Sequence, residues 1–176
     1  LRGIPKTTVA IALALTAISY WALSFYDLLA LRYLRKTLPY ARMVFTSFIA
    51  YAFGHNLGLA AFTGAAIRMR LYASAGLTAV DVVTVQGFCS LTSALGLATI
   101  GGLSLLLEPE QLRAAVPLPP WWTRGVGLAL LAAVVAYAVG SVIWKRSMEF
   151  RGWQLRIPRP SISFPQLALG ILDISI

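Results

Sequence analysis

The chain has 176 residues, of which 59% are hydrophobic and only 12% are charged. That balance excludes an ordinary soluble globular domain, and a single cysteine, Cys89, excludes a disulfide within the chain. The formal net charge is +9, but the basic residues lie between apolar runs, where anionic lipid head groups attract them. We therefore interpret the charge as a membrane signal and expect no nucleic-acid partner.

Long apolar runs predict the fold class. A helix needs about 20 apolar residues to cross about 30 Å of hydrocarbon, and the runs lack the alternating pattern of a barrel strand. The sequence therefore predicts an all-α, polytopic transmembrane bundle without a soluble domain. Because the chain begins with Leu1 and ends inside an apolar run, we expect one fragment of a larger transmembrane domain. The runs cover residues 7–31, 43–67, 82–107 and 125–144, and a fifth begins at residue 161.

The first run contains one acidic residue, Asp27, near its end. A charged carboxylate at that depth costs a few kcal/mol unless it is paired or hydrated. One interpretation is a cation site that faces a cavity. The structural alternative is an ion pair near the interface, to Arg32 or to Arg68.

The second run, residues 43–67, contains the unusual stretch YAFGHNLG, which ends at Gly58. Glycine destabilises a helix interior by about 1 kcal/mol relative to alanine, so the stretch indicates a break that lines a cavity. The alternative is a continuous helix whose Gly54 and Gly58 form a packing face, with His55 and Asn56 hydrogen-bonding between helices.

Charge placement favours a broken, re-entrant segment. If residues 43–67 enter the membrane and return, eleven of the fifteen basic residues share one side, whereas a simple crossing leaves nine there. The positive-inside rule makes the richer side cytoplasmic. Loops 32–42 and 68–81 would then both be cytoplasmic.

Arg68 and Arg70 directly follow the broken segment. A guanidinium can donate two parallel hydrogen bonds to a phosphate, so this pair is a candidate phosphate site. The structural alternative is two further positive-inside loop residues. Residues 145–160 mix basic and aromatic side chains and predict a surface-lying segment, and Trp121 and Trp122 fit an aromatic belt.

Catalytic chemistry finds little support. One histidine, one cysteine and six acidic residues are scattered and form no metal-ligand cluster or nucleophile–base arrangement. We assign no catalytic residue, metal or cofactor, and we expect Cys89 only to pack.

Residues 24–78 resemble the transmembrane domain of the bifunctional lysylphosphatidylglycerol flippase/synthetase family (MprF-type). The resemblance covers about residues 15–105 well and the rest of the chain loosely, and it rests on three pieces in order. These are the pair Tyr26 and Asp27 at the end of a span, a broken span with Asn56, Gly58 and Gly64, and an R-x-R-x-Y motif made of Arg68, Arg70 and Tyr72.

The resemblance implies a multi-pass protein of the bacterial inner membrane. It would move aminoacylated phosphatidylglycerol, usually the lysyl form, from the inner to the outer leaflet and give resistance to cationic antimicrobial peptides. Asp27 would attract the amino group. The remaining head-group contacts would come from Tyr26, His55, Asn56, Thr63, Arg68 and Arg70.

The implied partners are anionic and aminoacylated phospholipids, the remainder of the chain with a synthetase domain, and possible further copies of the protein. Bond-making chemistry would belong to the synthetase domain. Two alternatives stay open. The region could only anchor a phosphatidylglycerol lysyltransferase and feed it lipid, or it could transport a solute through the broken segment.

Overall fold

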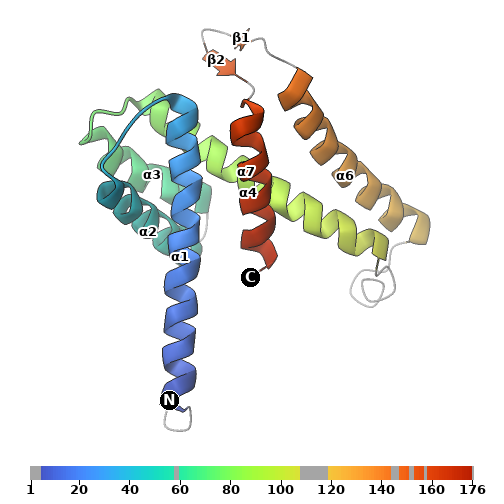
Figure 1. Ribbon diagram of the computed structural model, residues 1–176, viewed down its shortest axis with the longest axis horizontal. Coiled ribbons are helices and arrows are strands. Elements are labelled where there is room, and N and C mark those ends of the chain that lie inside the picture. The colour runs from blue at the N-terminus through green and yellow to red at the C-terminus, as the bar shows by residue number, and fades with distance from the viewer. Residues whose placement is uncertain are drawn as a thin grey trace. The chain divides into compact units, whose positions relative to one another are not determined.

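The computed structural model describes residues 5–57, 60–107, 119–143, 147–150, 153–156 and 158–175. This part of the chain is helical except for one two-stranded hairpin, as Figure 1 shows, so the predicted all-α fold class is confirmed. The elements are α1 (Lys6–Leu34), α2 (Tyr40–Leu57), α3 (Ala60–Ala73), α4 (Ala79–Leu107), α6 (Pro120–Ile143), β1 (Ser147–Phe150), β2 (Trp153–Arg156) and α7 (Pro160–Ser175).

Three helices are long and apolar enough to cross a membrane, namely α1, α4 and α6. They match the predicted spans at residues 7–31, 82–107 and 125–144. At about 1.5 Å per residue, the 29 residues of α1 extend about 43 Å, more than the hydrocarbon thickness. Large apolar side chains such as Leu13, Ile18, Leu128 and Val135 point outward on α1 and α6. Such surfaces suit lipid or further helices, and not water.

The chain divides into two compact units, one ending at Ser90 and the other beginning at Leu91. The first unit holds α1, α2, α3 and the start of α4. The second holds the rest of α4, α6, the β-hairpin and α7.

In the first unit, the run at residues 43–67 is broken into two helices that pack against each other. The start of α2 meets the end of α3, because Arg42 Nη2 donates to Ser74 Oγ at 3.0 Å. Midway, Gly64 lies against the carbonyl oxygen of Ala50. The pair is therefore an antiparallel helical hairpin, and the alternative of one continuous crossing helix is wrong.

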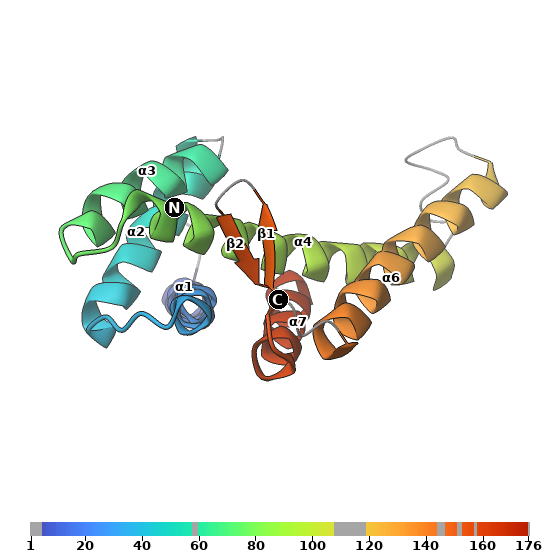
Figure 2. The same ribbon diagram turned by 90° about the horizontal axis from the view of Figure 1, so that it is seen from above.

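The helical hairpin lies across α1. In Figure 2, where α1 is seen almost along its axis, α2 and α3 run sideways past it. Aromatic contacts fix this crossing: the rings of Tyr20 and Phe48 are 5.1 Å apart, and Trp21 Nε1 donates to Tyr40 Oη at 3.0 Å. The hairpin therefore meets α1 along its length and not only at its end.

The two loops at the open end of this hairpin lie together. Lys36 Nζ is 3.5 Å from Asp81 Oδ2, which links the loop after α1 to the start of α4. Asp81 also forms a capping box, because it accepts from the Thr78 amide at 2.9 Å and its own amide donates to Thr78 Oγ1 at 3.2 Å. Both loops thus lie at one end of the unit, which is the arrangement that the charge count favours.

In the second unit, α7 crosses α4 with almost no side chain between the two backbones. A Cβ atom added to Gly96 would collide with the backbone of Gly170. Beside this crossing, Gln166 is fully buried and connects three helices. Its Nε2 donates to Thr92 Oγ1 on α4 at 2.9 Å, and its Oε1 accepts from the Tyr137 hydroxyl on α6.

Part of the predicted surface-lying segment, residues 145–160, forms the antiparallel strands β1 and β2, with Ser147 opposite Arg156 and Phe150 opposite Trp153. Its contact with a membrane surface stays a prediction. Trp121 and Trp122 are both exposed at the start of α6, as an aromatic belt requires. The loop between α4 and α6 falls outside the described residues.

Candidate functional site

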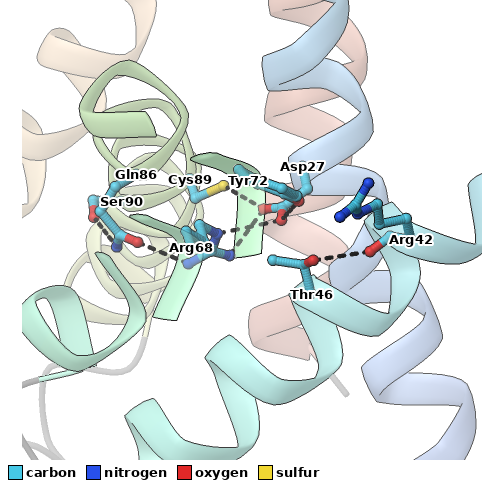
Figure 3. Close-up of polar contacts among 8 residues, drawn as sticks. All are labelled: Asp27, Arg42, Thr46, Arg68, Tyr72, Gln86, Cys89 and Ser90. Carbon is cyan, nitrogen blue, oxygen red and sulfur yellow. Dashed lines mark hydrogen bonds and ion pairs between the residues drawn. The ribbon is translucent and has the colours of Figure 1, made fainter. Parts of the chain in front are cut away.

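A buried ion pair joins α1 to the helical hairpin. Arg68 on α3 donates from Nη2 to Asp27 Oδ1 at 2.8 Å and from Nε to Asp27 Oδ2 at 3.2 Å (Figure 3). The two side chains are 0% and 1% exposed. This is the bidentate geometry that a planar guanidinium forms with a carboxylate, and that a lysine cannot reproduce.

Two further donors complete the carboxylate's contacts. The Tyr72 hydroxyl donates to Asp27 Oδ2 at 2.6 Å, and Cys89 Sγ donates to Asp27 Oδ1 at 3.1 Å. An ionised carboxylate has about four lone-pair sites. Each oxygen of Asp27 therefore accepts twice, and the Ser47 hydroxyl lies beside the carboxylate as well.

The guanidinium is held on its other side by α4 and α2. Arg68 Nη1 donates to Gln86 Oε1 at 2.7 Å, and the guanidinium carbon lies 4.8 Å from the centre of the Tyr51 ring. Gln86 Nε2 in turn donates to Ser90 Oγ at 3.4 Å. Arg68 thus has polar partners on two edges and an aromatic face against its plane.

Helical spacing brings these groups together. Arg68 and Tyr72 are four residues apart on α3, and Gln86 and Cys89 are three apart on α4, so each pair shares one helix face. We call the set the Asp27 cluster. It consists of Asp27 from α1, Tyr51 from α2, Arg68 and Tyr72 from α3, and Gln86 and Cys89 from α4.

The ion pair at the centre of the cluster is buried inside the protein, away from water. Asp27 is seven residues before the end of α1, which corresponds to about 10 Å along the helix. Removing either partner of a buried ion pair costs about 3–5 kcal/mol, because the other charge is left uncompensated. The hydrogen bonds of Asp27 and Arg68 are what make the burial of this pair tolerable.

The structure brings together only some of the predicted head-group residues. Asp27 lies against the broken segment, as expected. Its carboxylate contacts Arg68, so the structure shows the ion pair, which was the structural alternative to a cation site that faces a cavity. Tyr26 is buried beside the cluster, with its ring centre 6.4 Å from that of Tyr51. Arg68 and Arg70 were predicted to form one phosphate site. Arg68 is buried, whereas Arg70, two residues later on α3, is exposed on another face of the helix.

The remaining predicted residues lie toward the closed end of the helical hairpin. Thr63 is half-buried on α3. His55 and Asn56 belong to α2, but their side chains lie outside the described part of the structure, and so does Gly58. Their contact with a head group stays a prediction.

Four members of the cluster were not predicted as site residues, namely Tyr51, Tyr72, Gln86 and Cys89. Cys89, which we expected only to pack, hydrogen-bonds to Asp27. Gln86 is a polar residue three positions before it in an otherwise apolar run, and that spacing was the available signal. Tyr72 was identified only as the last residue of the R-x-R-x-Y motif. Its position one turn after Arg68 is the signal that both side chains can contact the same group, which is Asp27.

Metal binding has no basis in the part of the chain that the structure describes, where no three His, Cys, Asp or Glu side chains come together. The cluster is instead an ion-pair centre. It pairs one carboxylate with one guanidinium.

Comparisons with known proteins point to the membrane. No family model matches the chain. It is 36% identical to the uncharacterized protein slr0712 of Synechocystis over 98% of this chain and 53% of that protein. It is 27% identical to the inner membrane protein YbhN of Escherichia coli, over 98% of this chain and 54% of that protein.

The chain spans about half the length of the curated relatives it matches. Three helices able to cross a membrane, together with the similarity to YbhN, identify it as a multi-pass inner membrane protein. Neither relative's name describes a lysylphosphatidylglycerol flippase or synthetase.

Proposed function

We propose that this chain is part of a domain that moves aminoacylated phosphatidylglycerol from the inner to the outer leaflet of the bacterial inner membrane. The observation that carries the proposal is a fully buried carboxylate–guanidinium pair, formed between a helix long and apolar enough to cross a membrane and a broken helical hairpin. The resemblance of residues 24–78 to the MprF-type transmembrane domain supports the same reading and implies the lysyl form of the lipid.

Exchange of partners is the central step of the proposed mechanism. An aminoacylated head group carries phosphate and ammonium, the two charges that the cluster already pairs. Opening the Asp27–Arg68 pair lets the phosphate take the guanidinium and the ammonium take the carboxylate. Each protein charge then keeps a partner throughout, which avoids the cost of a bare charge in hydrocarbon.

The helical hairpin is suited to make this opening. Arg68 and Tyr72 belong to α3, which is not one of the spanning helices, whereas Asp27 belongs to α1. A small movement of the hairpin can therefore separate the pair without bending a spanning helix. Broken segments at the substrate site are a recurring device of secondary transporters.

Other residues have supporting roles in this proposal. Arg70 is exposed near the open end of the hairpin, where it can meet a phosphate before the buried pair opens. Tyr26 packs against Tyr51. Thr63, His55 and Asn56 would contact the head group toward the closed end of the hairpin. The bond between amino acid and lipid would be made by a synthetase domain outside this chain, and export of the product would lower sensitivity to cationic peptides.

The test is a leaflet assay in cells that express the full-length protein. Asp27→Ala should lower outer-leaflet aminoacyl lipid while total aminoacyl lipid stays constant. Arg32→Gln removes an exposed charge from the same helix and serves as the control. A fall in total lipid would instead favour an anchor that feeds a lysyltransferase, and normal export by Asp27→Ala would refute the proposal.

A further inference from the structure

The charges of the Asp27 cluster cancel. Asp27 faces Ser47 from α2, Arg68 and Tyr72 from α3, and Cys89 from α4. Arg68 in turn faces Tyr51 from α2 and Gln86 from α4. Hydroxyl, amide and thiol groups are uncharged near neutral pH. Within the described residues, the centre therefore holds one negative charge, on Asp27, and one positive charge, on Arg68.

Two other charged side chains of this unit have partners outside the buried centre, and Arg70 is exposed. Arg42 is exposed and hydrogen-bonds to Ser74, and Lys36 pairs with Asp81 at the loop end. Neither pair belongs to the buried centre. A net charge carried in by a ligand would thus stay uncompensated where compensation is most needed.

Opening the pair leaves one vacant edge on each partner. Asp27 keeps the Tyr72 and Cys89 donors, one on each oxygen, and loses the two Arg68 donors. Those two acceptor positions suit one ammonium. Arg68 keeps Gln86 at Nη1 and presents its free Nε and Nη2 edge, which suits one phosphate.

From this we infer that the site selects head groups by net charge and prefers a zwitterion with one phosphate and one ammonium. The inference rests on the proposed function and changes its preferred substrate, from the lysyl form that the resemblance implies to an aminoacylated head group without net charge. A phosphatidylglycerol head group brings a phosphate but no ammonium, so it leaves Asp27 unpaired. A lysyl head group brings two ammonium groups, and the cluster offers one carboxylate.

The experiment uses the full-length protein in liposomes. Three lipids with the same labelled acyl chain differ only in head group: phosphatidylglycerol, alanyl-phosphatidylglycerol and lysyl-phosphatidylglycerol, with net charges of about −1, 0 and +1. A membrane-impermeant quencher follows their arrival in the outer leaflet. We expect the alanyl lipid to move about 100-fold faster than either other lipid, the factor that one unpaired charge in a membrane implies.

Charge-altering variants provide the second arm. Asp27→Asn makes the centre positive and should move the preference to phosphatidylglycerol, whereas Arg68→Gln makes it negative and should favour the lysyl lipid. Arg32→Gln should keep the wild-type order. A merely structural role would slow all three lipids alike and would not invert their order.

The outcomes separate the two proposals. Movement of no lipid by the wild-type protein would refute the proposed translocation itself. Movement of all three at similar rates, or fastest movement of a charged one, would keep translocation and refute the charge selection. If a variant does not fold, the wild-type order alone decides.

Discussion

Gly64 lies one turn before Arg68 on α3 and leaves the space through which the guanidinium reaches Gln86. A Cβ atom at this position would lie 3.1 Å from Arg68 Nη1 and 3.3 Å from Gln86 Oε1. Both separations are shorter than an ordinary van der Waals contact. The absence of a side chain at Gly64 is therefore part of how the buried ion pair is positioned.

Gly64→Ala should weaken the Arg68–Gln86 hydrogen bond and destabilise the protein by about 1 kcal/mol. A lost bond to a charged group costs about 1.5–3 kcal/mol, and the better helix propensity of alanine returns up to about 1 kcal/mol. Thermal unfolding in detergent measures the effect. Gly87→Ala on α4, where a Cβ meets nothing within 4 Å, is the matched control. Equal melting temperatures for both variants would contradict this role of Gly64.

Arg68→Lys should destabilise the protein by about 1–3 kcal/mol although the charge is kept. A lysine ammonium cannot hold both Asp27 oxygens and Gln86 together, so buried acceptors lose their donors. Arg70→Lys changes an exposed residue and should stay within about 0.5 kcal/mol of the wild type. Thermal unfolding of the two variants side by side distinguishes them, and similar losses would show that the buried geometry is unimportant.

The loops after α1 and after α3 should both face the cytoplasm. Their contacts through Lys36 and Asp81 place them at one end of the unit, and the positive-inside rule assigns that end. Cysteines placed at Thr37 and Ala75 in a Cys89→Ser background should resist an impermeant thiol reagent added to intact cells. Pro119→Cys, which the crossing helix α4 separates from residue 75 in the chain, should react. Labelling at residue 37 or residue 75 would overturn the assignment.

Gly96→Ala should loosen α7 from α4 and cost about 1–3 kcal/mol, the usual penalty for overpacking. The collision would be with the backbone of Gly170, which cannot move aside as a flexible side chain can. Gly101→Ala is the control on the same helix, because a Cβ there meets nothing within 4 Å. Unfolding temperatures should fall for the first variant only, and an unchanged value for Gly96→Ala would contradict the close crossing.

The spans and the break could be predicted because they depend on local composition. Runs of about 20 apolar residues specify membrane helices, and the weak helix formers around Gly54 indicated where one run divides. Asp27 was identified for the same reason, since an isolated acid in an apolar run is conspicuous. Each of these signals is contained within one segment.

The partner of Asp27 depends on tertiary packing, and sequence spacing alone leaves it open. Arg32 is five residues away and Arg68 is 41 residues away in the chain, yet Arg68 is the partner. The helical hairpin of α2 and α3 reverses the chain and lays α3 across α1, and this brings Arg68 to Asp27. Arg70 differs from Arg68 only by pointing to another side of α3, and that difference follows from where the neighbouring helices lie.

The sole cysteine of the chain, Cys89, allows movement at the ion pair to be followed by thiol labelling. Cys89 is 3% exposed and its thiol is hydrogen-bonded to Asp27, so a thiol reagent cannot reach it while the pair is closed. Opening of the Asp27–Arg68 pair alone keeps that hydrogen bond, whereas movement of α1 away from α4 would break it and expose the sulfur. The rate at which a membrane-permeant maleimide labels the unmodified protein should therefore report how often α1 and α4 separate.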